Sequence, residues 1–193
     1  MKTLIVTGGI GSGKSEVCRI LEAMGYPVYN ADSRMKALYD TDPRLIPAIE
    51  KALGGSFRTA EGRLDRKALA EVIFSDGEKL RALEMTVHPY LFADFRNWAA
   101  ANGSEAVVLE SAIICSSPCP DKPEGKILLV DAPESLRLER ACRRDGASPR
   151  SIRDRMAAQR LEDIHPDEVI INDGNLADLG KKVRTVMETI FND

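Results

Sequence analysis

The residues best suited to chemistry form a glycine-rich segment near the N-terminus, Gly8–Ser15, which reads GGIGSGKS. Its spacing fits the pattern G-x-x-x-x-G-K-[S/T], in which backbone N–H groups curl around phosphate oxygens. Lys14 would reach the β- and γ-phosphates of a nucleoside triphosphate, and the Ser15 hydroxyl would bind Mg²⁺. A glycine-rich turn that matches by chance is the alternative. The buried strand before the segment and the amphipathic helix after it favour the phosphate site.

A second candidate segment is rich in arginine. Residues 140–160 hold seven arginines and two aspartates, a local charge of +5 in a chain of net charge −3. Guanidinium groups neutralise the charge that spreads over a transferring phosphoryl group. We expect a lid over the triphosphate, with Arg140 and Arg144 as its phosphate contacts; a solvated helix face is the alternative for some of the set. The arginines are Arg140, Arg143, Arg144, Arg150, Arg153, Arg155 and Arg160.

A carboxylate follows the second predicted strand, in the run Asn30-Ala31-Asp32. Ligands of open α/β sheets bind at the carboxyl ends of the strands. Asp32 could orient an acceptor hydroxyl there and take its proton as the phosphoryl group is transferred. From its position alone, Asp32 is equally suited to cap the next helix.

Five short apolar or β-branched runs predict the strands that would position these residues. They alternate with segments of helical period, such as 176–190, and the alternation predicts a parallel sheet covered by helices on both sides, an α/β fold. The predicted strands are Thr3–Thr7, Pro27–Asn30, Ala106–Leu109, Lys126–Val130 and Glu168–Ile171.

The second and third predicted strands are separated by roughly seventy residues, far more than a loop needs. The interval contains helical patterns at 38–53, 66–74, 80–85 and 90–101, interrupted by Pro43, Gly54-Gly55, Gly62 and Pro89. We therefore expect residues 33–102 to form a helical substrate-binding lobe inserted in one nucleotide-binding domain that spans 1–193.

Composition excludes several classes of protein. The 193 residues are 44% hydrophobic and 30% charged, which is ordinary for a globular chain, and the balance of charges gives no attraction to nucleic acid or to anionic membranes. No apolar run is long enough for a transmembrane span. We expect a cytoplasmic protein, with a monomer favoured. The four cysteines, Cys18, Cys115, Cys119 and Cys142, are expected to be thiols rather than a metal site.

The phosphate loop leaves several functions open. The run Ile171-Asn172-Asp173 lacks the lysine of a guanine-binding motif, which argues against a GTPase, and motor ATPases are usually longer. A small-metabolite kinase fits the length and the arginine-rich segment. A nucleoside or nucleotide kinase and a non-catalytic nucleotide switch are the alternatives.

Together these motifs resemble the dephospho-coenzyme A kinase family over nearly the whole chain. The combination of TGGIGSGKS with a mid-chain His-Pro pair and an arginine-rich lid is far more specific than the loop alone. The matching stretches are Thr7 to Ser15, Ala31-Asp32, Glu61 to Arg66, Val87-His88-Pro89, Asp131-Ala132-Pro133, Arg140 to Asp145, Gln159 and Val169 to Gly174.

The resemblance implies a five-stranded P-loop core with a coenzyme A-binding lobe and a lid. It also implies transfer of the γ-phosphoryl group of ATP, with Mg²⁺, to the ribose 3′-hydroxyl of dephospho-coenzyme A. Asp32, Lys14 and Arg140 are then the catalytic candidates, with Asp32 as general base, and Ser15 is the metal ligand. Asp32, Arg66 and His88 are the acceptor-site candidates. The ATP-binding candidates are Gly9, Gly11, Ser12, Gly13, Lys14, Ser15, Glu16, Arg144 and Asn172.

The chain departs from the family pattern in four places. Glu16 stands where Thr is usual, Asn30 stands where a first Asp is common, and Ile171 replaces an Asp in the last strand. In the family the third strand usually ends in a Pro-Leu-Leu-Phe-Glu run, whereas here residues 112–116 read AIICS and the Glu is missing. Glu110 or Ser111 could serve the metal through water in its place. His88 would then bind substrate or support the lobe, because a histidine before a proline is more often structural than catalytic.

Overall fold

The computed structural model describes residues 1–74, 76–159 and 164–191. It divides the chain into two compact units. The core unit comprises Met1–Asn30, Asn102–Ser116 and Glu124–Asp193, and the helical unit comprises Ala31–Ala101 and Ser117–Pro123.

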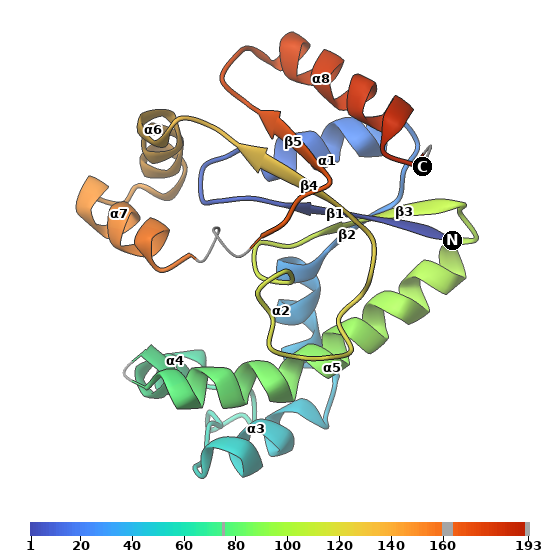
Figure 1. Cartoon of the computed structure of the whole chain (residues 1–193). Helices are drawn as coiled ribbons and strands as arrows, with labels where there is room; N and C mark the ends of the chain where they lie inside the picture. Colours follow the sequence, from blue (N-terminus) through green and yellow to red (C-terminus); the bar gives the residue numbers. More distant parts are fainter. Residues whose placement is uncertain (75, 160–163, 192–193) are drawn as a thin grey trace. The chain divides into compact units, whose positions relative to one another are not determined.

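In the part of the chain that the structure describes, a five-stranded, all-parallel sheet lies at the centre of the core unit (Figure 1). Its strand order is β2-β3-β1-β4-β5. The α/β class and the five predicted strands are confirmed, with ends that differ by one residue at most. The strands are β1 (Lys2–Thr7), β2 (Val28–Asn30), β3 (Ala106–Glu110), β4 (Lys126–Asp131) and β5 (Glu168–Ile171).

The register of the sheet brings the carboxyl ends of three strands together. Glu110 of β3 is paired with Val6 of β1 and with Asn30 of β2. Residues that follow these strands therefore start from one edge of the sheet, which is where ligands of parallel sheets bind.

The described residues of the core unit form four helices: α1 (Lys14–Ala23), α6 (Glu134–Asp145), α7 (Pro149–Ala157) and α8 (Leu176–Thr189). Helices α1 and α8 contact each other and lie over the same side of the sheet, whereas α6 and α7 follow β4 and pack together (Figure 1). The core between sheet and helices is apolar and includes Leu4, Val17, Leu21, Leu128 and Val183. Burial of such side chains is what fixes the helices on the sheet.

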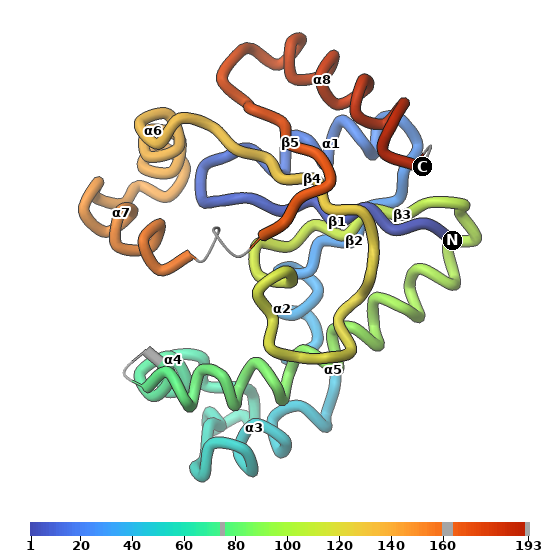
Figure 2. The backbone as a smooth tube through the Cα atoms, viewed as in Figure 1, coloured from blue at the N-terminus to red at the C-terminus, as the bar shows by residue number. Residues whose placement is uncertain are grey.

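The helical unit contains α2 (Ala31–Thr41), α3 (Leu45–Leu53), α4 (Arg66–Phe74) and α5 (Gly77–Asn102). Its own apolar core includes Leu45, Ile49, Leu69 and Val87. Residues 117–123 return to this unit after β3 and lie against α5, where Arg96 Nη1 donates to the carbonyl of Asp121 (3.3 Å; Figure 2). The sequence had assigned this short segment to no element.

Two helical expectations need correction. The pattern at 38–53 is two helices separated at Asp42–Arg44 around Pro43, and the first of them begins at Ala31, directly after β2. The predicted break at Pro89 is wrong, because α5 continues through that proline. Apolar side chains on both sides of Pro89, among them Val87, Leu91 and Phe92, are buried, and their burial outweighs the loss of one helical hydrogen bond.

Within the described residues, no helix has the length and apolar character needed to cross a membrane.

Candidate active site

The glycine-rich segment lies between the end of β1 and the start of α1. Three of its glycines have positive φ angles that favour glycine, and two of these are Gly11, with φ +77°, and Gly13, with φ +99°. A Cβ atom at Gly13 would lie 2.1 Å from Asn172 Nδ2, and one at Gly11 would lie 2.1 Å from the carbonyl oxygen of Arg137. Conformation and close packing both therefore require glycine at these positions.

Lys14, the first residue of α1, holds its ammonium group within this loop. Its Nζ donates to the carbonyls of Gly8 (2.6 Å) and Gly9 (3.3 Å). The Ser12 N–H also donates to the Gly9 carbonyl (3.1 Å), which closes the turn. The site thus combines a fixed positive charge with the N-terminus of a helix, and both favour an anion such as a phosphate group.

Two buried hydroxyl groups border the same loop. Thr7 Oγ1 and Ser12 Oγ are inaccessible and have no hydrogen-bond partner among the described residues. Buried hydroxyls without partners are rare in folded proteins, so these two mark a place where a polar ligand fits. Ser12 was a predicted ATP-binding residue. Thr7 was not, because a threonine that ends a strand carries no distinctive signal.

The Ser15 hydroxyl donates to Glu110 Oε1 at 2.8 Å. The other carboxylate oxygen, Oε2, accepts from Asn30 Nδ2 at 2.5 Å. Of the two residues suggested in place of the missing family Glu, the structure brings Glu110 to Ser15. The hydroxyl of Ser111 instead accepts from the N–H groups of Ile113 and Ile114 (3.3 and 3.1 Å).

Cys18 lies on α1 near the same carboxylate. Burial, reinforced by the negative charge of Glu110, raises the pKa of its thiol far above the usual range. The thiol therefore remains protonated and is no nucleophile at neutral pH. All four cysteines are free, and no cluster of three or more His, Cys, Asp or Glu side chains that could hold a metal ion occurs in residues 1–74, 76–159 and 164–191.

Asn172, which follows β5, links the loop to α6. Its Nδ2 donates to the Ser12 carbonyl (2.9 Å), and its own carbonyl accepts from Arg140 Nη1 (3.0 Å). A pocket of about 420 Å³ opens beside these residues. It brings together three predicted ATP-binding residues, Gly13, Glu16 and Asn172, and the catalytic candidate Arg140 with residues from the start of α8. Its lining is Gly13, Glu16, Arg140, Arg143, Asn172, Gly174, Asn175, Leu176 and Leu179.

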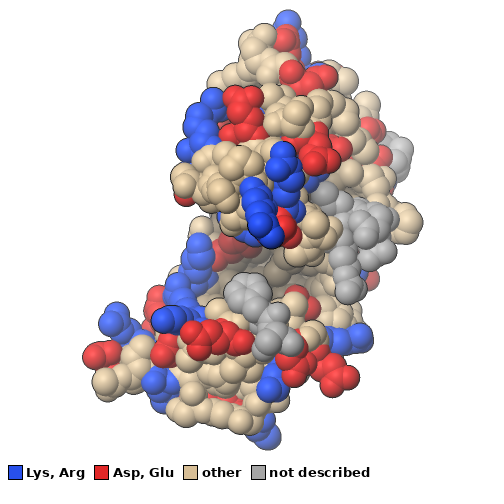
Figure 3. All heavy atoms as spheres, turned by 90° about the vertical axis from the view of Figure 1, so that its left-hand side faces the viewer, with Lys and Arg blue, Asp and Glu red and all other residues tan. Residues whose placement is uncertain are grey.

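Lys and Arg side chains gather over α6 and α7 on one face of the core unit (Figure 3). Arg144 is one of them, but its guanidinium binds Asp145 (Nε to Oδ1, 2.6 Å), as does Arg155 (Nη1 to Oδ2, 2.8 Å). These two guanidinium groups hold the pKa of the Asp145 carboxyl far below its usual range. The predicted contact between Arg144 and ATP stays a prediction, and Arg160 lies outside the described residues.

Two residues that contact the loop were missed as site residues. Arg137 of α6 donates from Nε to the Ile10 carbonyl (3.2 Å) and from Nη1 to Asp131 (3.3 Å). Gln159 accepts the Ile10 N–H through Oε1 (2.7 Å). Arg137 lies one helical turn before Arg140, so the arginine pattern could have been extended to include it. Gln159 had only the family resemblance to single it out.

The acceptor-site candidates all belong to the helical unit. Asp32 is exposed in the first turn of α2. Arg66 begins α4 and binds the Lys36 carbonyl and the Asp40 carboxylate on α2, each at 3.2 Å. The guanidinium also lies 5.9 Å from the centre of the Tyr39 ring. Arg66 thus ties α4 to α2 through its present contacts.

His88 is buried in α5, and its Nδ1 lies 2.6 Å from Ser117 Oγ. Burial lowers the pKa of the imidazole, which favours the neutral ring. The same Ser117 hydroxyl accepts from the Cys119 N–H (3.3 Å). Of its two expected roles, these contacts favour support of the helical unit, because His88 holds segment 117–123 onto α5.

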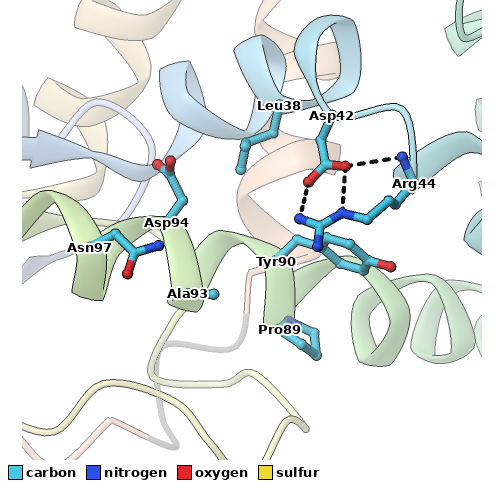
Figure 4. A pocket seen from close by; sticks show the side chains of 8 residues that line it. All are labelled: Leu38, Asp42, Arg44, Pro89, Tyr90, Ala93, Asp94 and Asn97. Atoms are coloured by element: carbon cyan, nitrogen blue, oxygen red, sulfur yellow. Dashed lines mark hydrogen bonds and ion pairs between the residues drawn. The ribbon is translucent and has the colours of Figure 1, made fainter.

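The helical unit has a pocket of about 370 Å³ between α2 and α5 (Figure 4). Arg44 lies at one end, where its guanidinium binds Asp42 (Nη2 to Oδ2, 2.7 Å) and lies 5.3 Å from the centre of the Tyr90 ring. Hydrogen bonds from Arg44 lower the pKa of the Asp42 carboxyl. The remaining lining residues are Leu38, Pro89, Ala93, Asp94 and Asn97.

Comparison with known proteins identifies the family. The family model described as dephospho-CoA kinase matches residues 3–178. A dephospho-CoA kinase of Porphyromonas gingivalis is 42% identical over 162 residues, which are 84% of this chain and 79% of that protein. A dephospho-CoA kinase of Chlorobaculum tepidum is 39% identical over an alignment of 196 residues, which covers 96% of this chain and 93% of that protein.

A solved structure from Thermus thermophilus agrees with the fold. It is 31% identical, with a TM-score of 0.79, and the match covers 99% of this chain and 98% of that one. The family model spans most of the chain, and both curated relatives exceed 30% identity over most of its length. The chain therefore belongs to the dephospho-CoA kinase family, a family of enzymes.

Proposed function

We propose that this chain transfers the γ-phosphoryl group of ATP to the ribose 3′-hydroxyl of dephospho-coenzyme A, giving ADP and coenzyme A. The 3′-oxygen forms a bond to the γ-phosphorus, the bond from that phosphorus to the β–γ bridging oxygen breaks, and the hydroxyl loses its proton. One observation carries the proposal beyond family membership. The Ser15 hydroxyl, the Glu110 carboxylate and the Lys14 ammonium are gathered around one glycine-rich loop.

The triphosphate would bind at this loop. N–H groups of Gly9, Gly11 and Gly13 and the Ser12 hydroxyl would surround its phosphates, and Lys14 would exchange its two carbonyl partners for β- and γ-phosphate oxygens. A phosphate oxygen is a charged acceptor and forms the stronger hydrogen bond with an ammonium group. The unpartnered hydroxyls of Thr7 and Ser12 support a polar ligand at this place.

The residues at the loop fit Mg²⁺. This ion prefers hard oxygen ligands, and proteins usually bind it through one or two carboxylates, water and the phosphates of the substrate. Ser15 would supply the direct oxygen, and Glu110, at 2.8 Å from that hydroxyl, would act through water. The bound ion would neutralise charge on the β- and γ-phosphates. Asn30 keeps the Glu110 carboxylate oriented toward Ser15.

The adenosine of ATP would occupy the pocket beside Asn172, Glu16 and Arg140. Arg140 would add positive charge near the phosphates, and Arg144 would join it on release from Asp145. Residues 140–160 would then act as the lid that excludes water from the reacting phosphoryl group.

The acceptor would bind to residues of the helical unit, which we equate with the expected substrate lobe at 33–102. Asp32 would orient the 3′-hydroxyl and accept its proton. Arg66 would meet an acceptor phosphate, and His88 would keep the unit in shape. The cytoplasm remains the compartment that the sequence predicts, and a monomer remains the expected state.

The test measures ADP formation from Mg-ATP with and without dephospho-coenzyme A, with the product identified by mass. We expect acceptor-dependent ADP and a product heavier by one phosphoryl group. Asp32→Asn should lower kcat by about 10²-fold or more if the carboxylate takes the proton. Asp121→Asn, an exposed carboxylate in the same unit, is the matched control. ADP release at the same rate with and without the acceptor would refute the kinase assignment and favour a nucleotide switch. Phosphorylation of another nucleoside, in a panel of acceptors, would show that the acceptor is not dephospho-coenzyme A.

A further inference from the structure

The α6–α7 segment, residues 134–159, consists of the two helices and the two residues that follow α7. Two of its side chains bind the same loop residue, Ile10. Arg137 Nε donates to the Ile10 carbonyl at 3.2 Å, and Gln159 Oε1 accepts the Ile10 N–H at 2.7 Å. The proposed reaction assigns neither side chain a contact with a substrate. Both polar groups of one loop residue are thus held by side chains more than 120 positions away in the sequence, at separations of 127 and 149.

The Arg137 contact sets the direction of a loop donor. A trans peptide is planar, and its C=O and N–H point in opposite directions. The Ile10 carbonyl belongs to the same peptide as the Gly11 N–H. When the carbonyl points to Arg137, the Gly11 N–H must point away from α6. Arg137 therefore fixes the orientation of one N–H group that the loop would offer to phosphate.

The Gln159 contact acts on the preceding peptide in the same way. Because the Ile10 N–H points to Gln159, the Gly9 carbonyl points in the opposite direction. That carbonyl accepts the Ser12 N–H (3.1 Å) and lies 3.3 Å from Lys14 Nζ. Gln159 thus helps to shape the turn that holds the lysine.

Arg137 is itself fixed in place. Its side chain is only 12% exposed, and its Nη1 lies 3.3 Å from Asp131 at the end of β4. The backbone of α6 packs on the neighbouring loop residue, since a Cβ atom at Gly11 would lie 2.1 Å from the Arg137 carbonyl oxygen. The loop tip therefore rests on α6 through backbone as well as side-chain contacts.

We propose that Arg137 and Gln159 are positioning residues that orient the Ile10–Gly11 and Gly9–Ile10 peptides for the triphosphate before it binds. The proposal rests on the proposed function only in taking ATP as the nucleotide. A loop with its peptides already oriented loses less conformational freedom on binding, so the affinity for ATP is higher. The α6–α7 segment then contributes to the ATP site through the loop, in addition to any arginine that touches phosphate.

The experiment compares Arg137→Met, Arg137→Lys and Gln159→Met with the wild type. Each methionine removes the polar contact and keeps a long side chain, and the lysine keeps one cationic donor. Calorimetry with Mg-ATP, without acceptor, gives the Kd of ATP. Steady-state kinetics give the KM of both substrates, and thermal unfolding gives the Tm. Arg184→Met, on the exposed face of α8, is the matched control.

We expect Arg137→Met to raise the Kd of Mg-ATP about tenfold, the effect of losing one hydrogen bond to a charged group. Gln159→Met should raise it less, about threefold, because its contact is neutral. The KM of dephospho-coenzyme A should stay within about twofold of the wild-type value, and Arg137→Lys should recover part of the ATP affinity. The control should bind ATP as the wild type does.

A lower Tm with an unchanged Kd for ATP in both methionine variants would overturn the proposal, because the contacts would then serve stability alone. An equal loss for both substrates would overturn it as well. Failure of the proposed function has a different signature. In that case the wild type would bind ATP and show no acceptor-dependent turnover, while the Kd comparison among variants would still decide the role of Arg137 and Gln159.

Discussion

At the scale of single residues, Glu110 has the clearest set of contacts in the core unit. Its two carboxylate oxygens accept from Ser15 and Asn30, and its charge adds to the effect of burial in raising the pKa of the nearby Cys18 thiol. In the family pattern the expected glutamate is the last residue of a Pro-Leu-Leu-Phe-Glu run, later in the chain, and this sequence lacks that run. The carboxylate is instead the last residue of β3, which fixes it more firmly than a loop would.

Glu110→Gln should weaken the response to Mg²⁺. Glutamine keeps the size of the side chain and removes its charge, and its NH₂ group has to face either Ser15 or Asn30, both of which donate to Glu110 now. Loss of such an outer metal partner typically costs about 10- to 100-fold in metal affinity or activity. Initial rates as a function of Mg²⁺ at saturating ATP would measure the effect.

Glu105→Gln, an exposed carboxylate just before β3, is the control for this change. It should leave the Mg²⁺ dependence as it is in the wild type. If Glu110→Gln reduced kcat equally at every Mg²⁺ concentration, the carboxylate would act on the loop structure and not through the ion.

At the scale of elements, periodicity and β-branched runs were enough to predict the sheet and helix α4, because they depend on local patterns. The continuity of α5 could not be predicted in this way. Proline breaks most helices, and only tertiary burial of residues such as Val87 and Phe92 decides that this one continues. Pro89 has no N–H group to donate to the carbonyl of Met85, four residues earlier in the helix. Met85 itself is exposed.

The candidate site likewise has residues that local patterns predict and residues that only tertiary contacts reveal. The loop residues, Lys14 and Ser15 were predictable because their spacing is fixed by one turn. Arg137 and Gln159 were missed since the residue that they contact is far away in the sequence. Arg144 shows that a local pattern can also suggest too much. The local excess of arginine predicted a phosphate contact for Arg144, but it does not reveal that this guanidinium is paired with Asp145.

The contact between α5 and segment 117–123 should depend on pH. Burial lowers the pKa of His88 below its ordinary value of 6.5, so the unfolded chain takes up a proton in a range where folded His88 stays neutral. The free energy of unfolding should therefore fall as the pH falls below about 6.5, by at most about 1.4 kcal/mol per pH unit from this group. Chemical denaturation from about pH 7.5 to about pH 5.5 would show the trend.

His88→Asn removes the titrating group, and its amide is placed to retain a hydrogen bond near Ser117. The variant should lose less stability than the wild type over the same pH range, even where its stability at neutral pH is lower. His165→Asn is the control, since His165 is exposed. Identical pH slopes for the wild type and His88→Asn would show that His88 has no part in the acid sensitivity.

At the scale of the whole molecule, the chain consists of two units that each have an apolar core. The proposed ATP residues belong to the core unit, and the proposed acceptor residues Asp32 and Arg66 belong to the helical unit. The pocket of about 370 Å³ between α2 and α5 is also part of the helical unit, and its size falls within the range of small-molecule sites. This division predicts that each substrate stabilises a different part of the chain.

Hydrogen exchange with one substrate at a time tests that division. A ligand at about 100 times its Kd stabilises the folded state by about 2.7 kcal/mol, which slows exchange about 100-fold at amides that exchange only when the binding unit opens. Mg-ATP should protect the loop Gly8–Gly13 and α1, whereas dephospho-coenzyme A should protect α2 and α5. Lys14→Met should abolish the protection by ATP and leave the protection by the acceptor, because Lys14 belongs to the core unit alone. Protection by dephospho-coenzyme A that is confined to the core unit would place the acceptor site there and remove the proposed roles of Asp32 and Arg66.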